Sequence, residues 1–142
     1  MKISELFEDT TDYRIQHQAP DKDSGSPLHD LRGVYPDDIY GPQAAIYYGH
    51  YGGNHPLDRE SIRKIQSLRN KPKAGVQIYR AVPKGVKSIN PNDWVTINKN
   101  YAIEHGESWL HGKYKILTKI VFAKDLYNSG DSIHEFGYDP VG

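Results

Sequence analysis

Three segments in the second half of the chain alternate between apolar and polar side chains, and they constrain the fold more than any other feature. They are VQIYRAV (76–82), YKILTKIVFAK (114–124) and SIHEFGY (132–138). Successive side chains of a β-strand point to opposite faces, so a period of two residues predicts strands with one buried face. The shorter segment DWVTIN (93–98) has the same character. The second half of the chain is therefore predicted to form a sheet.

Helical signals lie mainly in the first half of the chain. The clearest is LDRESIRKIQSLRN (57–70), where Ile and Leu recur at helical spacing and Asp58 is a candidate N-cap. Shorter helices are predicted at PQAAIYYG (42–49) and at KNYAIEHG (99–106), the second ended by its glycine. Helices early and strands late predict an α+β fold with a mostly antiparallel sheet.

The composition changes near residue 28. The stretch HQAPDKDSGSPL (17–28) combines Pro, Gly, Ser and Asp with few apolar residues, which is typical of a linker. We therefore expect residues 1–28 to form a short helix, ISELFE, on a flexible linker, and residues 29–142 to form one compact domain. No run approaches the roughly 18 apolar residues of a membrane span, and the acidic start does not resemble a secretory signal. These features predict a soluble protein.

Composition argues against several kinds of site. Lys+Arg and Asp+Glu number 18 each, so the chain lacks the net positive charge of a non-specific nucleic-acid binder. It has no cysteine, which excludes disulfides, thiolate metal sites and a Cys nucleophile. The seven histidines show no metal-ligand spacing such as HExxH, so no metal is expected. A nucleophile elbow for Ser-His-Asp catalysis is also missing from the sequence.

Three polar side chains fall inside predicted strands: Arg80, Thr96 and Glu135. Alternation places Glu135 on one face of its strand and His134 on the other, with Phe136. A buried arginine or carboxylate needs a partner, because an isolated buried charge is costly. One interpretation is therefore a structural ion pair between Arg80 and Glu135, or two residues at strand edges that face water. The other is a functional site built on the strands.

The segments IYRAV, DWVTINKNYAIEHG and SIHEFGYDP, in this order, resemble the Arg, Ser/Thr and Glu segments of the ADP-ribosyltransferase fold, in the group named for its R-S-E motif. The segment LRGVYPDDIYG (31–41) extends the likeness to small ADP-ribosyltransferase-like domains of phage and prophage proteins. The resemblance spans about Leu31 to Pro140. It implies two small, mostly antiparallel sheets with flanking helices and an NAD cleft that has no Gly-rich nucleotide loop. The chain indeed has no GxGxxG or Walker pattern.

The resemblance also implies roles for individual residues. Arg80 would anchor a phosphate or ribose of NAD with its fixed fork of donors. Thr96 would shape the cleft and reach the nicotinamide ribose or the glutamate. Glu135 would bind the ribose 2′-hydroxyl and stabilise the oxocarbenium ion as nicotinamide leaves. Tyr101 is a candidate for stacking on nicotinamide and Tyr79 for contacting NAD, while packing in the core is the alternative for both.

The chain departs from the family in two places. Val95, Thr96 and Ile97 stand where many members have Ser-Thr-Ser, so one hydroxyl would do the work. Ile133 stands where enzymes that modify arginine have Gln or Glu, two residues before the catalytic glutamate. Either the acceptor is not arginine, or another residue activates it, or the domain only hydrolyses NAD or is inert. His134 is expected to be structural.

The resulting hypothesis is an NAD-dependent mono-ADP-ribosyltransferase of phage type. It would transfer ADP-ribose from NAD, its substrate, to an unidentified protein or nucleic-acid acceptor and release nicotinamide, without a metal. It would act in the host cytoplasm or the virion, away from membranes. The alternative is a virion structural or interaction protein that keeps the fold without catalysis and docks on a larger assembly through its N-terminal segment.

Overall fold

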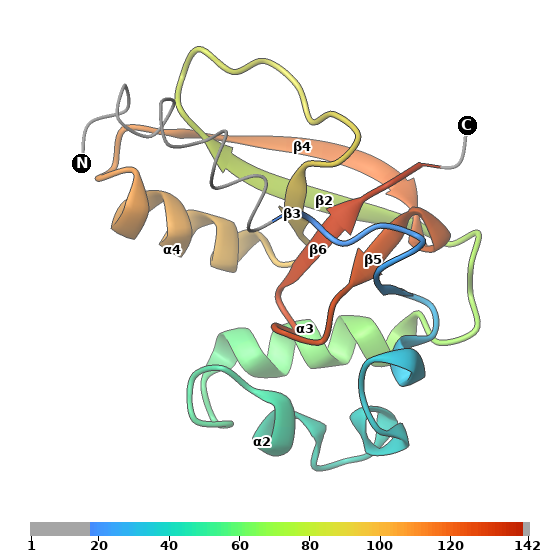
Figure 1. Ribbon diagram of the computed structural model, residues 1–142. Helices are drawn as coiled ribbons and strands as arrows, with labels where there is room; N and C mark the ends of the chain where they lie inside the picture. The colour runs from blue at the N-terminus through green and yellow to red at the C-terminus, as the bar shows by residue number, and fades with distance from the viewer. Residues whose placement is uncertain (1–17, 141–142) are drawn as a thin grey trace.

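The structure is a computed structural model that describes residues 18–140. In this range the strands form a six-stranded antiparallel sheet with the order β1-β5-β6-β3-β2-β4 (Figure 1). The strands are, in chain order, β1 (Ser26–Pro27), β2 (Gly75–Val82), β3 (Trp94–Thr96), β4 (Lys115–Phe122), β5 (Leu126–Asn128) and β6 (Glu135–Tyr138). The predicted α+β class with an antiparallel sheet is confirmed.

The sheet is continuous, so the prediction of two small sheets is wrong. Its two parts are nevertheless linked narrowly. β2 pairs with β4 over its full length, but it pairs with β3 at the single position Tyr79↔Thr96. One residue pair thus joins the β2–β4 ribbon to the other four strands. Alternation within one strand carries no information on such a link, because the link depends on pairing between distant segments.

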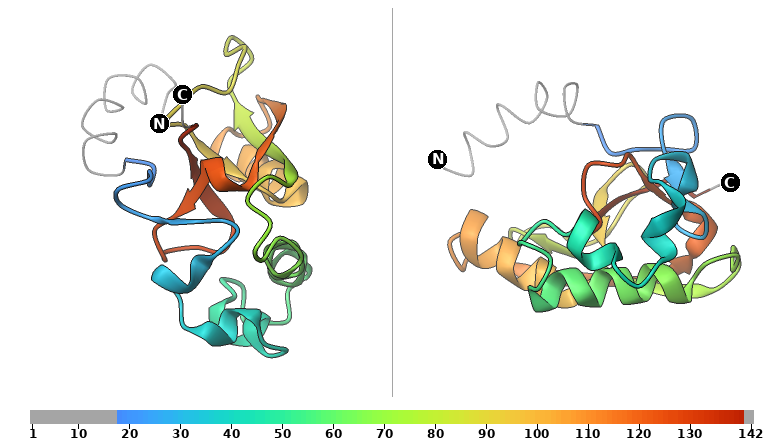
Figure 2. Two further views of the ribbon diagram at one scale, coloured as in Figure 1. Left: turned by 90° about the vertical axis from the view of Figure 1, so that its right-hand side faces the viewer. Right: turned by 90° about the horizontal axis from the view of Figure 1, so that it is seen from below.

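The described part of the chain has three α-helices and three short 3-10 helices. They are η1 (Leu31–Gly33), η2 (Asp37–Tyr40), α2 (Ala44–Tyr48), α3 (Pro56–Ser67), α4 (Lys99–Trp109) and η3 (Ala123–Asp125). Helices α2 and α3 pack together on one side of the sheet, opposite the loop that joins β2 to β3 (Figures 1 and 2). Helix α4 packs against β2 and also contacts β3 and β4. Within residues 18–140, no helix has the length and apolar content needed to cross a membrane.

Two predicted helix ends differ from the structure. The N-cap of α3 is His55, whose Nδ1 accepts a hydrogen bond from the N–H of Leu57 at 3.1 Å. Asp58, the predicted cap, is fully buried in the first turn and bonds to other segments. Helix α4 does not end at Gly106 but continues to Trp109. The ring of Tyr114 packs where a Cβ at Gly106 would lie.

The compact part begins before the predicted boundary after residue 28. Ser26 and Pro27 form β1 against β5, and the side chain of Leu28 is fully buried. The backbone of Pro20 lies so close to Gly137 of β6 that a Cβ on this glycine would overlap it. The predicted linker is therefore packed on the sheet from Pro20 onward. The predicted helix ISELFE lies outside the described residues.

A hydrophobic core joins the sheet to α3 and to the 3-10 helices η1 and η2. The alternation predicted for β2 is confirmed, since Val76, Ile78 and Val82 are buried while Gln77 is exposed. Other fully buried members of the core are Leu31, Ile39, Ile65, Ile97, Leu126 and Phe136. Burial of these apolar side chains fixes how α3 lies against the sheet, and so fixes what α3 brings to the site.

Candidate functional site

Arg80, Thr96 and Glu135 lie on three neighbouring strands. They belong to β2, β3 and β6, and β3 lies between the other two. In the register, Thr96 is directly opposite Glu135 on one side and Tyr79 on the other. Arg80 follows Tyr79, so its side chain leaves β2 on the opposite face of the sheet from those of Thr96 and Glu135. The sequence predicted the strands, but their order comes from long-range pairing that a single sequence does not reveal.

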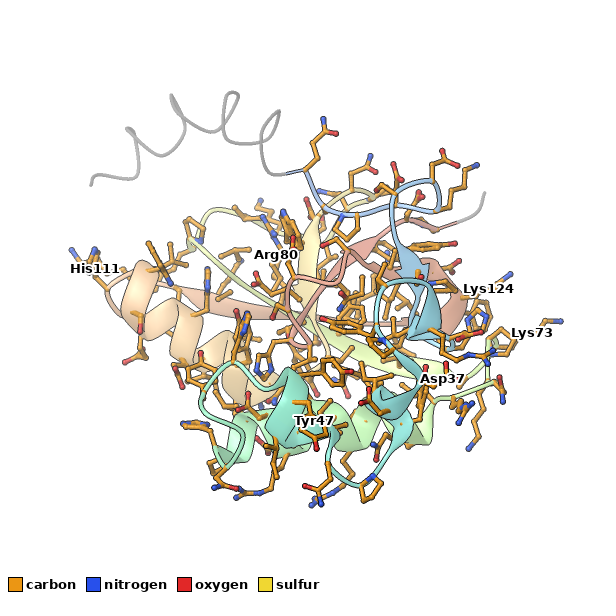
Figure 3. The ribbon with its side chains drawn as sticks, turned by 60° about the horizontal axis from the view of Figure 1, so that its bottom comes forward. Asp37, Tyr47, Lys73, Arg80, His111 and Lys124 are labelled. Carbon is orange, nitrogen blue, oxygen red and sulfur yellow. The ribbon has the colours of Figure 1, made fainter. Side chains whose placement is uncertain are left out.

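The guanidinium group of Arg80 reaches across to β3 (Figure 3). Its Nη1 donates a hydrogen bond to the carbonyl oxygen of Trp94 at 2.7 Å, and its Nε lies 3.9 Å from Oδ2 of Asp93. Nε is buried and makes no hydrogen bond within residues 18–140. The ion-pair alternative is not borne out, because the carboxylate partner of Arg80 in this range is Asp93 and not Glu135. The guanidinium group thus keeps hydrogen-bonding capacity in reserve.

Glu135 is half-buried at the start of β6, close to α4. Burial first, and then the charge of Glu135 and a hydrogen bond to it, raise the pKa of Tyr101. The Tyr101 hydroxyl therefore lies beside the Glu135 carboxylate and is protonated at neutral pH. Desolvation lowers the pKa of His105, while the charge of Glu135 acts to raise it and that of Arg80 to lower it. His105 thus lies within reach of both charges.

Thr96 and Tyr79 have partners within the fold. Thr96 is 4% exposed, and its Oγ1 accepts a hydrogen bond from the N–H of Asn98 at 3.1 Å. Tyr79 is half-buried, and Nζ of Lys64 in α3 lies 5.8 Å from its ring centroid. Thr96 therefore supports the residue that begins α4, and Tyr79 contacts α3.

A small hollow of about 50 Å³ adjoins Tyr101. It is lined by Tyr51, Tyr101, Glu104, His105, Ser108 and Trp109. Burial first, and then the charge of Glu104 and a hydrogen bond to it, raise the pKa of Tyr51 to about 12. Ligand pockets usually measure roughly 300–1,000 Å³, so this hollow could hold only one end of a nucleotide.

A larger hollow of about 390 Å³ lies against β4, away from the predicted site residues. It is lined by Gly75, Ile120, Val121, Phe122, Asp125 and Tyr138. Its lining is mainly apolar and contains none of the residues that the resemblance assigns to NAD.

Four fully or almost fully buried polar residues form a hydrogen-bonded chain behind Tyr101, which we call the buried array: Asp58, His134, Ser61 and Asn98. His134 Nε2 lies 3.0 Å from Oδ1 of Asp58, and His134 Nδ1 lies 2.7 Å from Oγ of Ser61. Asn98 Nδ2 donates to Oγ of Ser61 at 3.2 Å. The array links α3, the segment before β6 and the N-cap of α4.

The protonation of the buried array follows from its partners. A carboxylate only accepts, so His134 donates from Nε2 to Asp58, and Nδ1 of the neutral ring accepts from the hydroxyl of Ser61. Burial lowers the pKa of His134, although Asp58 opposes the shift. Burial acts to raise the pKa of Asp58, but the N–H groups of Tyr51 and His50 and the His134 ring outweigh it and lower the pKa. The array therefore holds a carboxylate beside a neutral imidazole.

These three groups resemble a Ser-His-Asp nucleophile only in composition. Ser61, His134 and Asp58 all have an exposed fraction of 0%, so no substrate reaches the hydroxyl of Ser61. Their role is to hold the surrounding segments. The array could not be predicted from local sequence patterns, because Asp58 and His134 are separated by 76 residues.

His134 is fully buried, whereas Glu135 at the start of β6 is half-buried. β6 begins only at Glu135, and His134 lies in the bend before it, where a strand's alternation does not apply. The ring of His134 stacks on Tyr101, with 4.6 Å between centroids and 12° between planes. Tyr101 therefore touches both members of the His134–Glu135 pair, one through its ring and the other through its hydroxyl.

Within residues 18–140, no group of three or more His, Cys, Asp or Glu side chains is arranged to hold a metal ion. The chain matches no protein-family model, no curated protein and no solved structure.

Proposed function

We propose that the protein is a mono-ADP-ribosyltransferase that uses NAD as its substrate. The observation that supports this proposal is the adjacency of β2, β3 and β6, which carries Arg80, Thr96 and Glu135 to one region of the sheet, with Thr96 directly opposite Glu135. The resemblance in sequence requires these three residues to act on one molecule. Segments that are far apart in the chain satisfy this requirement only if their strands are close.

Arg80 would bind the diphosphate of NAD. The Arg80 side chain is 30% exposed, and a guanidinium group can bind a phosphate with two parallel hydrogen bonds. The bond from Nη1 to Trp94 holds the group in place before the substrate arrives. The hollow at Tyr101 would take only the nicotinamide end, so the rest of the dinucleotide would lie along the surface toward Arg80.

Glu135 would promote loss of nicotinamide. As the C1′–N1 bond of the nicotinamide ribose breaks, the electron pair goes to the ring nitrogen and positive charge develops on the ribose. A placed carboxylate stabilises this charge in the transition state. One face of the Tyr101 ring is covered by His134, so nicotinamide would stack on the opposite face.

Glu104 would activate the acceptor. Ile133, two residues before Glu135, has an exposed fraction of 0% and no ionisable group, so it cannot take a proton. Glu104 lines the hollow beside Tyr101, and its charge helps to raise the pKa of Tyr51. An acceptor N–H or O–H group that attacks C1′ would lose its proton to this carboxylate.

The test measures nicotinamide release and ADP-ribose transfer separately, with NAD labelled in the adenylate part. Glu135→Gln should reduce both rates at least about 100-fold, as the loss of a transition-state electrostatic group usually does. Arg80→Ala should raise the KM for NAD more than it lowers kcat, because a ground-state contact is lost. Glu104→Gln should reduce transfer while nicotinamide release persists as hydrolysis.

Exposed charged residues provide matched controls. Asp37→Asn removes a carboxylate and Lys73→Ala a cation at exposed positions away from Arg80 (Figure 3), and both should keep the wild-type rates. The proposal fails if the wild-type protein releases no nicotinamide from NAD, or if Glu135→Gln releases it as fast as the wild type.

Two observations support the alternative of a binding protein without catalysis. The hollow at Tyr101 is small, and Arg80 already donates one hydrogen bond to the backbone of β3. Calorimetry with NAD separates the two functions. Binding that Arg80→Ala weakens supports the enzyme, whereas no heat of binding at millimolar NAD, together with no turnover, supports the binding protein.

A further inference from the structure

We infer that the buried array of Asp58, His134, Ser61 and Asn98 positions Tyr101 and, through the Tyr101 hydroxyl, the carboxylate of Glu135. This inference rests on the proposed function for the importance of Glu135. The positioning itself is a property of the fold and can be tested without turnover. None of the four residues reaches the surface, so each would act through Tyr101 and not on a substrate.

Asn98 holds the first turn of α4 in place. Asn98 Oδ1 accepts hydrogen bonds from the N–H groups of Asn100 and Tyr101 at 3.0 and 3.3 Å, and so caps the helix that carries Tyr101. The other end of the same amide donates to Ser61 Oγ and to the carbonyl oxygen of Leu57, both at 3.2 Å. One side chain thus fastens the first turn of α4 to α3.

His134 holds the ring of Tyr101 in place. His134 stacks on it at 4.6 Å, and both ring nitrogens of His134 are bonded to α3, one to Asp58 and one to Ser61. A ring bonded at both nitrogens cannot rotate without breaking a buried hydrogen bond, which costs about 1–3 kcal/mol. The imidazole is therefore a fixed wall for the phenol.

Ser61 contacts both of these supports, His134 and Asn98. Its hydroxyl donates to His134 and accepts from Asn98, so a single oxygen joins the support of the ring to the support of the helix backbone. Tyr101 is thereby fixed at its main-chain nitrogen and at its ring. Its hydroxyl lies beside the carboxylate of Glu135. Such support matters because a displacement of about 1 Å of a reacting group can cost about 100-fold in rate.

The kinetic test compares Ser61→Ala, Asn98→Asp and Tyr101→Phe with wild type. Ser61→Ala breaks the junction, and Asn98→Asp keeps the cap acceptor of α4 but removes both donors to α3. Tyr101→Phe keeps the stacked ring and removes only the hydroxyl. We expect kcat for nicotinamide release to fall about 10- to 100-fold in each, with the KM for NAD changed less than about threefold.

The control is Ser67→Ala on the same helix, where the hydroxyl donates to the carbonyl oxygen of Lys64 at 2.7 Å on the exposed side. It should keep the wild-type kcat. Circular dichroism and urea unfolding must show each variant folded at the assay temperature. If Ser61→Ala is not folded, Tyr101→Phe and Asn98→Asp decide the kinetic question.

A spectroscopic test does not need turnover. The ¹³Cζ signal of Tyr101 is assigned in ¹³C-tyrosine protein by its loss in Tyr101→Phe, and its shift on Glu135→Gln reports the hydrogen bond between the two residues. We expect this shift to shrink to less than about half when Ser61→Ala is added, because energetic coupling requires the contact to be intact.

The outcomes separate the inference from the proposed function. A wild-type protein without nicotinamide release contradicts the proposed function, and the Tyr101 signal then decides the inference alone. An active wild type with Ser61→Ala, Asn98→Asp and Tyr101→Phe at the same kcat overturns the inference and leaves the proposed function standing. An unchanged Tyr101 shift in the Ser61→Ala background also overturns the inference.

Discussion

The ring of Tyr101 lies parallel to the buried imidazole of His134, with 4.6 Å between the ring centroids and 12° between the planes. Through this contact the polar interior of the protein meets its candidate site. On one side the imidazole is bonded to Asp58 and Ser61 of α3. On the other side the phenol hydroxyl lies beside Glu135, whose charge helps to raise the pKa of Tyr101. Stability and function are therefore coupled in this region, and the two can be separated by the choice of substitution.

Asp58→Ala should be among the most destabilising single substitutions in the protein. The carboxylate accepts hydrogen bonds from the N–H groups of His50, Tyr51 and Gly53 at 3.0, 3.0 and 3.3 Å, and from His134 at 3.0 Å. Removing it leaves four buried or half-buried donors without a partner. We expect the free energy of unfolding to fall by about 3–5 kcal/mol, as for one partner lost from a buried pair.

Urea unfolding monitored by tryptophan fluorescence measures this loss. Asp131→Ala is the control, because this carboxylate is exposed and its hydrogen bond comes from the half-buried Ser129. A loss below about 1 kcal/mol for Asp58→Ala, close to that of the control, would contradict the assigned role of the carboxylate.

Acid should destabilise the protein in two steps. Burial lowers the pKa of His134, so below pH ~6.5 the unfolded chain binds a proton that the folded chain does not, and the free energy of unfolding falls toward the lowered folded pKa. Asp58 has a lowered pKa because its hydrogen bonds outweigh its burial. Its contribution is present above pH ~3.9 and is lost as the pH falls through the folded pKa.

Urea unfolding at intervals from pH 7.5 down to pH ~2 covers both steps. His134→Gln should flatten the curve between pH ~6.5 and pH ~5. His105 also has a lowered pKa, so His105→Gln is measured alongside to assign the remaining slope. An unchanged slope in His134→Gln would show that the pKa of His134 is the same in the folded and unfolded chains.

The elements that sequence predicted well are those with a long period of their own. Helix α3 and strand β2 each span at least eight residues and bury one side, so their patterns are repeated often enough to be read. Strand β4 also has eight residues, but Val121 is the one buried residue within it, and Ile120 and Phe122 are exposed. Strands β1 and β5 have two and three residues, too few to show a period. They exist because the main chain of each finds a partner in the sheet.

The candidate site divides along the same line. Arg80, Thr96 and Glu135 were visible as polar residues within predicted strands. The partners that define their environment were not visible, because Tyr101 and His134 come from a helix and from a bend whose positions depend on α3. The strand predicted over 132–138 also began three residues before β6, which begins at Glu135.

Thr96→Val should test how much of the role of Thr96 is structural. Valine has nearly the same shape, but it cannot accept the hydrogen bond from the buried N–H of Asn98. We expect the free energy of unfolding to fall by about 1–3 kcal/mol, because a buried donor loses its partner. Thr96→Ser keeps the hydroxyl and should lose less.

Thermal unfolding of both variants measures the difference, and nicotinamide release is measured in the same samples. A Thr96→Val variant as stable as the wild type would contradict the structural role of the hydroxyl. A Thr96→Ser variant as unstable as Thr96→Val would show that the methyl group of Thr96 contributes as much as its hydroxyl.

Gly137→Ala should test whether the segment before β1 is packed on the sheet. A Cβ at Gly137 would overlap the backbone of Pro20, so this segment must move or β6 must shift. Overpacking of this kind costs about 1–3 kcal/mol. Gly85→Ala is a matched control, since its Cβ would meet no atom within 4 Å, and it should leave the stability unchanged or slightly higher. Hydrogen exchange should show faster exchange of the Leu28 N–H, which donates to the carbonyl oxygen of Leu126 at 2.8 Å, in Gly137→Ala alone. Equal stability and equal exchange in the two variants would show that Pro20 does not rest on β6.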